Sequence, residues 1–448
     1  MPRCAISLCI CTASSIRPDR ILSTLLLTLY RGLTRLVTPG GPLLLNWRKK
    51  RGKEDARRIH ERLGHASIAR PHGELIWLHG ASVGEALALL PLIEALRAKS
   101  LNVLITTGTV TSAQILAQRL PSGAIHQYVP LDLPGCMTRF VDHWKPDLVM
   151  LAESEIWPNL ILEVTDRAIP LIMVNARLSE RSYQRWQKLP GFILALLKRV
   201  DLCLAQTKDD AARLMLLGAP RVQVAGNLKY DAPAPPVDST RLAEVTAMIG
   251  PRPVWVAAST HSGEEEIILA VHRHLVKRLP DLLTIIVPRH ANRGAQIAAI
   301  AQANGIETGL RSQGDHPVPG RGVYIADTMG ELGLFYRVAS LIYVGKSLGA
   351  EGGQNPIEPA KLGSAILHGP HVANFAEVYD LLDKAGGALM VADADTLART
   401  LSMLLSDPAA LRRMARAAAE TVENLGGASS NVIKAMEPWL VQMRMERR

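Results

Sequence analysis

The sequence is poor in the residues that several classes of protein need. Aromatic residues make up 4% of the 448 residues, which leaves few platforms for stacking the bases of single-stranded nucleic acid. The five cysteines are an odd number and include no C-x-x-C pair, so neither a disulfide framework nor a zinc ribbon is expected. Aspartate, histidine and cysteine do not cluster at the spacing of metal ligands. We therefore expect no metal and no nucleic-acid partner.

The excess positive charge is concentrated near the N-terminus. The formal net charge is +10, and residues 31–70 hold eleven Lys and Arg against three acidic residues. Just before them lies ILSTLLLTLY, ten uncharged residues, whereas a bilayer span needs about 20 apolar residues. An apolar helix followed by basic residues is typical of an interfacial anchor on an anionic membrane surface. The alternative is a buried first helix with a solvated basic loop.

Short apolar runs alternate with helix-period segments from residue 74 onward. Runs such as LIWLHG (75–80) predict strands, and a proline-rich segment interrupts the alternation before VWVAAS (254–259) resumes it. The pattern predicts an α/β fold of two domains, each with a doubly wound parallel sheet. The expected ranges are 1–20 for a disordered stretch or a wrongly assigned start, 21–73 for an apolar and basic anchor, 74–231 for the first domain, 232–238 for the linker, and 239–448 for the second domain with the terminal helices.

Polar residues follow the predicted strands of the first domain, where ligands of such sheets bind. Glu85 in HGASVGEA would lie on the first turn of a helix, either as a general base or as a charge that favours the helix N-terminus. Glu153 and Glu155 in LAESEIWPN would share one side of an extended segment, or cap the next helix. Lys229 in GNLKYD is either a site cation or a solvated surface lysine.

The second domain shows the same arrangement. Ser259 and Thr260 in ASTHSGEEE stand before a helix, where they suit a phosphate or a simple capping box, Thr260-x-x-Gly263 or Ser262-x-x-Glu265. Arg289 in VPRH is a planar donor for phosphate or carboxylate. In the glycine-rich segment GGQNPIEPA, Pro356 suits the first position of a helix, and Glu358 could accept two ribose hydroxyls.

Nine segments together resemble the 3-deoxy-D-manno-octulosonate (Kdo) transferases of lipopolysaccharide assembly. They are HGASVGE, ESEIWPN, NARLSERS, GNLKYD, ASTHSGEE, VPRH, DTMGEL, GGQNPIEPA and GPHVANF, in this order across residues 75–380. The resemblance implies a GT-B glycosyltransferase, with two Rossmann-like domains facing a central cleft and a short membrane-associated N-terminal helix. It implies transfer of Kdo from CMP-Kdo to the lipid A precursor lipid IVA at the cytoplasmic face of the inner membrane. CMP-Kdo is a co-substrate, and no cofactor is implied.

The family's motifs assign roles to matching residues. The glutamate of the SVGE motif accepts the proton, which is Glu85 here. The first glutamate of the E-x-E motif and the lysine of the G-x-L-K-x-D motif stabilise the transition state, which are Glu153 and Lys229. The implied CMP-binding residues are Pro288, Arg289, Met329, Gly330, Glu331, Asn355, Pro356, Ile357 and Glu358, with Ser259 and Thr260 as candidate donor contacts. The donor loop departs from the family at Lys346 and Gln354.

Two alternatives remain open on the residues alone. Another GT-B protein, a transferase or epimerase that uses a UDP-sugar, would show the same alternation of strands and helices. A non-enzymatic protein would use the basic segment to bind a membrane surface or nucleic acid. Protection against heating separates the first alternative, because CMP or CTP should protect the Kdo transferase and UDP should not.

Overall fold

The computed structural model describes residues 18–349 and 352–445, and the chain forms two compact units. The first unit is Met1–Ala232 with Gly427–Arg448, and the second is Pro233–Gly426. The expected disordered stretch or wrong start at 1–20 lies outside the described residues except for its last three, which begin helix α1.

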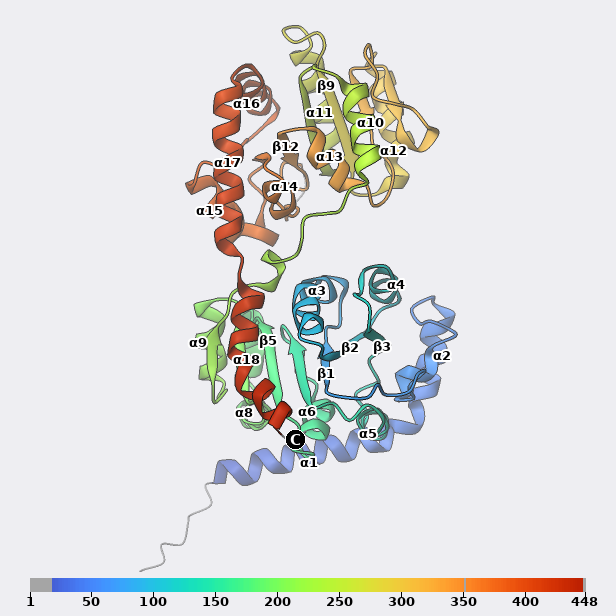
Figure 1. The fold of residues 1–448 in the computed structure, drawn as a ribbon, viewed down its shortest axis with the longest axis vertical. Helices are drawn as coiled ribbons and strands as arrows, with labels where there is room; N and C mark the ends of the chain where they lie inside the picture. Colours follow the sequence, from blue (N-terminus) through green and yellow to red (C-terminus); the bar gives the residue numbers. More distant parts are fainter. Residues whose placement is uncertain (1–17, 350–351, 446–448) are drawn as a thin grey trace, which may run out of the picture. The chain divides into compact units, whose positions relative to one another are not determined.

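A parallel sheet of seven strands, ordered β3-β2-β1-β4-β5-β6-β7, forms the centre of the first unit (Figure 1). Its strands are β1 (Leu75–His79), β2 (Asn102–Thr107), β3 (Ala124–Tyr128), β4 (Leu148–Ala152), β5 (Leu171–Ala176), β6 (Leu202–Ala205) and β7 (Val222–Val224). Both faces of β1 are buried: Leu75 and Trp77 pack in one apolar cluster, and Ile76 and Leu78 in another. The strand order reverses between β1 and β4, which is where doubly wound sheets bind ligands.

Helices cover both faces of this sheet. They are α1 (Pro18–Val37), α2 (Gly41–Lys50), α3 (Val83–Ala98), α4 (Val110–Arg119), α5 (Pro134–Trp144), α6 (Pro158–Thr165), α7 (Glu180–Trp186), α8 (Pro190–Leu197), α9 (Lys208–Leu216) and α18 (Ala428–Met445), with the 3-10 helices η1 (Thr38–Gly40), η2 (Ile59–Leu63) and η3 (Leu228–Tyr230).

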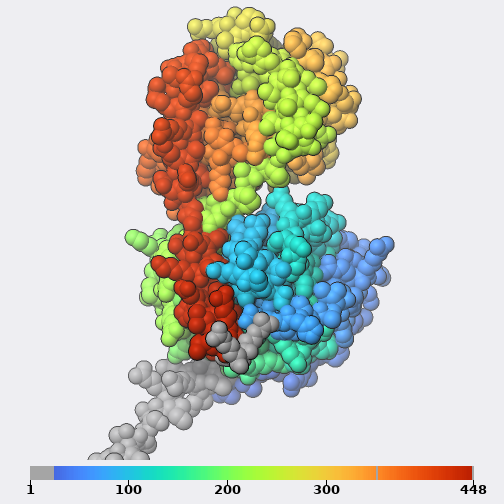
Figure 2. All heavy atoms as spheres, in the orientation of Figure 1, coloured from blue at the N-terminus to red at the C-terminus, as the bar shows by residue number. Residues whose placement is uncertain are grey.

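The last helix differs from the sequence expectation, which placed 239–448 in the second domain. Helix α18 packs against α3 in the first unit, and Figure 2 shows its red atoms beside the blue atoms of α3. Val432 and Met436 of α18 are buried in the apolar cluster that contains Ile76. The Asp231 carboxylate holds the start of α18, because it accepts from the backbone N–H of Gly427 at 2.7 Å and from that of Ser429. The chain therefore returns to its first unit.

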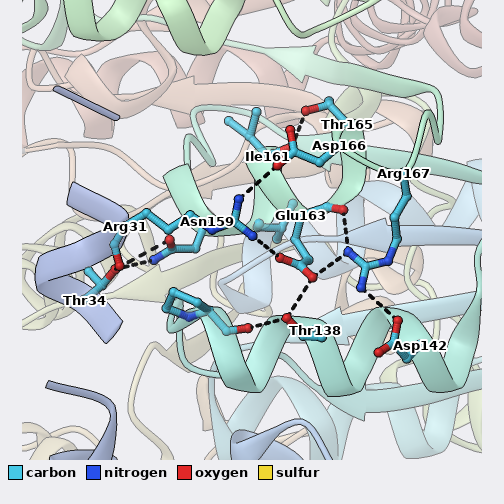
Figure 3. Close-up of polar contacts among 12 residues, drawn as sticks. Arg31, Thr34, Thr138, Asp142, Asn159, Ile161, Glu163, Thr165, Asp166 and Arg167 are labelled. Atoms are coloured by element: carbon cyan, nitrogen blue, oxygen red, sulfur yellow. Dashed lines mark hydrogen bonds and ion pairs between the residues drawn. The ribbon is translucent and has the colours of Figure 1, made fainter. Parts of the chain in front are cut away.

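Polar side chains of helix α1 bind it to the first unit (Figure 3). Arg31 donates to Glu163 at 3.0 Å and to Asp166 at 2.9 Å, both in or directly after α6. Thr34 accepts from the side-chain amide of Asn159 at 3.2 Å. The ring of Tyr30 meets Phe192 of α8 edge-on, with centroids 5.7 Å apart. The inward face of this helix thus combines polar contacts with an apolar one, because Leu27 is buried in the same apolar cluster as Leu75 and Trp77.

Part of the expected anchor segment 21–73 belongs to the body of the first unit. Glu54, Glu61 and Arg62 are 7%, 1% and 6% exposed. The Glu61 carboxylate accepts from the backbone N–H of Tyr128 at 2.8 Å, and Arg62 lies 3.3 Å from Glu54. These paired buried charges fix η2 against the end of β3, so this part of the segment is structural.

The second unit contains another parallel sheet of seven strands, ordered β10-β11-β9-β8-β12-β13-β14. Its strands are β8 (Val254–Thr260), β9 (Leu283–Pro288), β10 (Thr308–Leu310), β11 (Val323–Ile325), β12 (Leu341–Val344), β13 (Ala365–His368) and β14 (Ala388–Met390). The order reverses between β8 and β12, as it does between β1 and β4 in the first sheet. The expected pair of doubly wound, Rossmann-like parallel sheets is confirmed.

The second unit also contains helices, of which α10 packs against α13. They are α10 (Ser239–Ile249), α11 (Glu264–Leu275), α12 (Gly294–Ala303), α13 (Leu332–Val338), α14 (Ile357–Lys361), α15 (Ala376–Lys384), α16 (Ala394–Ser406) and α17 (Pro408–Leu425), with η4 (Ala291–Arg293), η5 (Arg311–Gln313) and η6 (Ala373–Phe375). Among the described residues, no helix combines the length and apolar character of a membrane span.

Candidate active site

Glu85 lies on the first turn of α3, directly after β1, as the sequence predicted. Its carboxylate accepts from Ser82 Oγ at 2.7 Å and from the backbone N–H of Ala81 at 2.7 Å, so it also caps the helix. Burial raises the pKa of this carboxyl, and the nearby carboxylates of Glu155 and Glu153 raise it further, against the two hydrogen bonds. A carboxyl with a raised pKa at the carboxyl ends of the strands is suited to accept a proton.

Glu153 and Lys229 form an ion pair at the end of β4. Lys229 Nζ lies 2.6 Å from Glu153 Oε1, and the Glu153 side chain is 17% exposed. The turn is not the extended segment that the sequence predicted, because Glu153 has a φ of 52° and the N–H of Glu155 donates back to Ala152 O. A left-handed backbone conformation is uncommon for glutamate, and such strained conformations are concentrated at functional sites. Lys229 is therefore held by a specific partner.

Asn175 connects the GNLKYD segment to the sheet. This residue, at the end of β5, has a φ of 51°, and its Oδ1 accepts from the backbone N–H of Leu228 at 2.9 Å. Leu228 is fully buried, and Asn227 Oδ1 accepts from the N–H of Lys229 at 3.0 Å. The backbone that carries Lys229 is thus fixed on both sides.

A histidine that the sequence did not single out lies beside these residues. His79, the last residue of β1, is fully buried, and its Nε2 is 3.7 Å from Glu155 Oε2. The indole of Trp157 donates to the same Glu155 oxygen. The sequence signal was the histidine at the end of the strand in HGASVGE, but only the fold shows that it faces Glu155.

In the second unit, a buried glutamate accepts hydrogen bonds from the backbone of the loop after β12. The Glu264 carboxylate accepts from the backbone N–H groups of Lys346, Ser347 and Leu348 at 2.7, 3.0 and 3.1 Å. It is fully buried and holds the loop after β12 in place. The start of α11 is capped by Gly263, not by either predicted box, because Glu266 accepts from the N–H of Gly263 at 3.1 Å.

Three of the predicted donor-binding residues converge on one buried tyrosine. Tyr336 of α13 hydrogen-bonds Ser259 and lies near Glu358 and Arg289, and burial raises the pKa of its phenol well above the ordinary value. Ser259 is near the end of β8, Arg289 directly follows β9, and Glu358 lies on α14 after β12, three strands that are neighbours at the switch point of the second sheet. The Arg289 side chain is exposed and makes no hydrogen bond or ion pair with other described residues. It is therefore available to a phosphate.

Thr260 and the residues around Asn355 serve the protein's own structure. Thr260 is fully buried, and its hydroxyl donates to Glu265 at 2.9 Å. Asn355 Oδ1 accepts from the N–H of Ile357 at 3.0 Å and so begins α14 after Pro356. In the donor loop, Lys346 has a φ of 59°.

Glu331 is engaged by two arginines. Arg311 donates to both carboxylate oxygens, Arg241 donates to Oε1 at 2.8 Å, and Thr328 donates to Oε2. The Arg311 hydrogen bonds are the main reason that the pKa of Glu331 is lowered. These four bonds use the lone pairs of the carboxylate. Contacts of this turn to a ligand therefore fall to its backbone and to Met329, which is 80% exposed.

A pocket of about 420 Å³ lies within the second unit beside this turn. Its lining includes Arg241, Met248, Arg311, His316 and Met329.

Two more of the predicted nucleotide-binding residues lie at turns. Pro288 ends β9, and Gly330 takes a positive φ of 82°, which glycine adopts without strain. Among the described residues, no group of three or more His, Cys, Asp or Glu is arranged to hold a metal ion.

The sequence is similar to that of one family of known proteins. Residues 57–232 match the family described as 3-deoxy-D-manno-octulosonic-acid transferase (kdotransferase). The chain is 37% identical over 411 residues to the Arabidopsis thaliana protein named probable 3-deoxy-D-manno-octulosonic acid transferase, mitochondrial, covering 89% of this chain and 92% of that protein. It is 35% identical over 387 residues to the 3-deoxy-D-manno-octulosonic acid transferase of Haemophilus influenzae, covering 84% and 89%.

Among solved structures, the chain resembles UDP-GlcNAc 2-epimerase from Neisseria meningitidis bound to UDP-GlcNAc. The TM-score is 0.58 at 16% sequence identity, and the match covers 82% of this chain and 100% of that chain. At this identity the likeness shows the shared GT-B fold and does not extend to the reaction.

Proposed function

Because this chain belongs to the 3-deoxy-D-manno-octulosonic acid (Kdo) transferase family, we propose that it transfers Kdo from CMP-Kdo to lipid IVA, the lipid A precursor. The observation that carries the proposal is the cluster at the switch point of the first sheet. There a carboxyl with a raised pKa, Glu85, stands beside the Glu153–Lys229 ion pair. These are the three residues that match the family's catalytic motifs.

The proposed mechanism assigns the proton transfer to Glu85. Glu85 takes the proton of an acceptor hydroxyl while the hydroxyl oxygen bonds to the anomeric carbon of Kdo. The bond from that carbon to the phosphate oxygen of CMP breaks on the opposite face, and CMP leaves with the bonding electrons. The configuration at the carbon inverts, and positive charge develops on the sugar ring in the transition state. Lys229, fixed by Glu153, would stabilise the negative charge of the donor.

The second unit would bind the nucleotide. Arg289 offers an exposed, unpaired guanidinium for the phosphate, and Glu358 lies near it around Tyr336 for the ribose hydroxyls. The turn with Met329 and Gly330 would contact the base by its backbone, while Glu331 fixes the turn through Arg311. Pro288, Asn355, Pro356 and Ile357 complete the proposed CMP site, with Ser259 and Thr260 at its inner wall.

An outward apolar face supports a membrane partner. Leu25, Leu29, Leu33 and Leu36 recur on one side of α1 and are between 59% and 78% exposed. The opposite side of the helix, with Leu27, Arg31 and Thr34, is already attached to the first unit, so this apolar face is free to enter a lipid headgroup region. It is continued by Leu43, Leu44 and Trp47 of α2, which are 74%, 47% and 50% exposed.

Basic residues border this apolar face. The exposed basic residues of the segment include Arg35, Lys49, Lys50, Arg51 and Lys53, whereas Arg48, Arg58 and Arg70 form ion pairs within the first unit. Exposed cations beside an apolar stripe favour an anionic surface. We place the reaction at the cytoplasmic face of the inner membrane, where the acyl chains of lipid IVA would hold the acceptor.

Mass spectrometry of the acceptor tests the function. The purified protein is incubated with lipid IVA and CMP-Kdo, and the lipid is then extracted and its molecular mass is measured. The expected result is a mass increase of one or more Kdo residues, and the number of residues follows from the same spectrum. An unchanged lipid in the presence of folded protein would overturn the proposal, and product from UDP-sugars instead would favour the UDP-sugar alternative.

A further inference from the structure

A buried histidine at the end of β1 has a free nitrogen. His79 is fully buried, and its Nε2 has no hydrogen-bond partner. Its other nitrogen, Nδ1, lies 2.9 Å from Thr106 Oγ1 and 3.1 Å from Thr106 O. A buried polar atom without a partner carries a free-energy cost, so its position calls for an explanation.

The other nitrogen of His79 belongs to a buried hydrogen-bond network. The indole of Trp77 can only donate, and it donates to Thr106 Oγ1 at 2.8 Å. Nδ1 of His79 contacts both the Thr106 hydroxyl, which can donate to it, and the Thr106 carbonyl oxygen, which can only accept from it. These contacts fix the imidazole ring in the core of the first unit. Its Nε2 faces Oε2 of the Glu155 carboxylate, 3.7 Å away.

Glu155 is held from its other side as well. The indole of Trp157 donates to Glu155 Oε2, the same oxygen that faces His79. The rings of Trp157 and His79 meet edge-on, with centroids 5.1 Å apart. The Glu155 side chain is 18% exposed, so the carboxylate is fixed at the edge of the site and not in bulk water.

This group lies against the first turn of α3. A Cβ placed on Gly80, the residue after His79, would lie 3.1 Å from Glu85 Cβ. The charged and titratable groups that face this turn are Glu153 and Glu155 from the turn after β4, Lys229 from η3, and His79 from β1. Of the two glutamates, Glu155 has the larger electrostatic effect on Glu85.

We propose that Glu155, held by Trp157 beside the buried His79, is a positioning residue that sets the basicity of Glu85. The inference rests on the proposed function, in which Glu85 accepts the hydroxyl proton. A fixed negative charge close to a carboxylate disfavours its ionised form and makes it a stronger base. The burial of Glu85 acts in the same direction. Glu153 also acts on Glu85, but Glu153 is paired with Lys229, and Glu155 has the larger effect.

The test is the pH profile of kcat/KM for Kdo transfer in the variant Glu155→Gln. Without the Glu155 charge, the acid limb should move to lower pH by about half a unit or more, and kcat at neutral pH should fall while the KM for CMP-Kdo stays unchanged. Glu94→Gln is the matched control, because Glu94 is an exposed glutamate on the same helix as Glu85. Glu94→Gln should leave the acid limb of the kcat/KM profile at the same pH as in the wild type.

A second variant covers the case in which Glu155→Gln folds poorly. Trp157→Phe keeps the ring beside His79 but removes the N–H that holds Glu155. It should shift the acid limb in the same direction by a smaller amount. An acid limb equal to that of the wild type in a folded variant overturns the inference and leaves the proposed function intact. A wild-type protein that transfers no Kdo overturns the proposed function itself.

Discussion

The ammonium of Lys229 lies 2.6 Å from Glu153 Oε1, joining η3, where the first unit's chain leaves for the second unit, to the end of β4. The two residues are 76 positions apart, and each sits on a constrained backbone. Glu153 has a left-handed φ, and the backbone of Lys229 is tied through Asn227 and Leu228. A pair this closely held is suited to present one fixed cation to a negatively charged donor.

Removal of the cation should therefore reduce transfer far more than stability. Lys229→Met should lower kcat by about a hundredfold or more, because one preorganised charge is lost from the transition state. Lys208→Met, at an exposed lysine of the same unit, is the control. In a double-mutant cycle with Glu153→Gln, the two losses should not add, since they remove one interaction. Additive losses would mean that the pair does not act as a unit.

The Arg311–Glu331 contact should appear in the pH dependence of stability. Because Arg311 lowers the pKa of Glu331 below 4.5, the contact stabilises the fold above that value and is lost as the pH falls through the lowered pKa. Arg311→Met should reduce the free energy of unfolding at neutral pH by about 2 kcal/mol. The loss should shrink in acid. Arg416→Met, which breaks an exposed pair with Glu420, should change little at either pH.

The apolar face of α1 should control binding to vesicles. The double variant Leu29→Ser with Leu33→Ser should weaken co-sedimentation with phosphatidylglycerol vesicles by about tenfold or more. Leu216→Ser is the matched control, because Leu216 is 72% exposed on α9 of the same unit. Binding should also weaken with added salt and on zwitterionic vesicles. Equal binding by the double variant and the control would reject this face as the membrane surface.

Glu85 should reduce stability at neutral pH. Its pKa is raised in the folded protein, so its stabilising contribution exists only at low pH and is lost as the pH rises from 4.5 through the raised value. Glu85→Gln should therefore have a Tm at pH 7 equal to or above that of the wild type, and the difference should disappear or reverse in acid. A clear drop in Tm at pH 7 would mean that the capping role of Glu85 dominates.

The central strands could be predicted from the sequence, whereas the edge strands could not. β1, β2, β8 and β9 are continuous apolar runs because both faces of each are covered. Strands β7, β10 and β14 have three residues each, which is too short to stand out as an apolar run, and β3 reads AIHQY, whose His and Gln interrupt the pattern. The return of α18 to the first unit depends on Asp231 and on contacts between residues about 200 positions apart, which no local pattern encodes.

The candidate site followed the same division. The placement of Glu85 and Arg289 could be predicted because each follows an apolar strand, and the parallel topology brings such residues to the carboxyl edge of their own sheet. The residues that contact the predicted site residues could not be predicted. His79 lies beside Glu155, Tyr336 lies near Arg289, and Arg311 binds Glu331, but the sequence around these three residues reads as ordinary strand, helix and loop.

Single-turnover transfer by Glu85→Gln, measured by mass spectrometry of the lipid, is the most direct test of the account. CMP binding to the same preparation is measured by calorimetry. We predict CMP affinity within about twofold of wild type and a transfer rate lowered by about a hundredfold or more. A folded variant that keeps more than about a tenth of the wild-type rate would contradict the assignment of Glu85 as the proton acceptor.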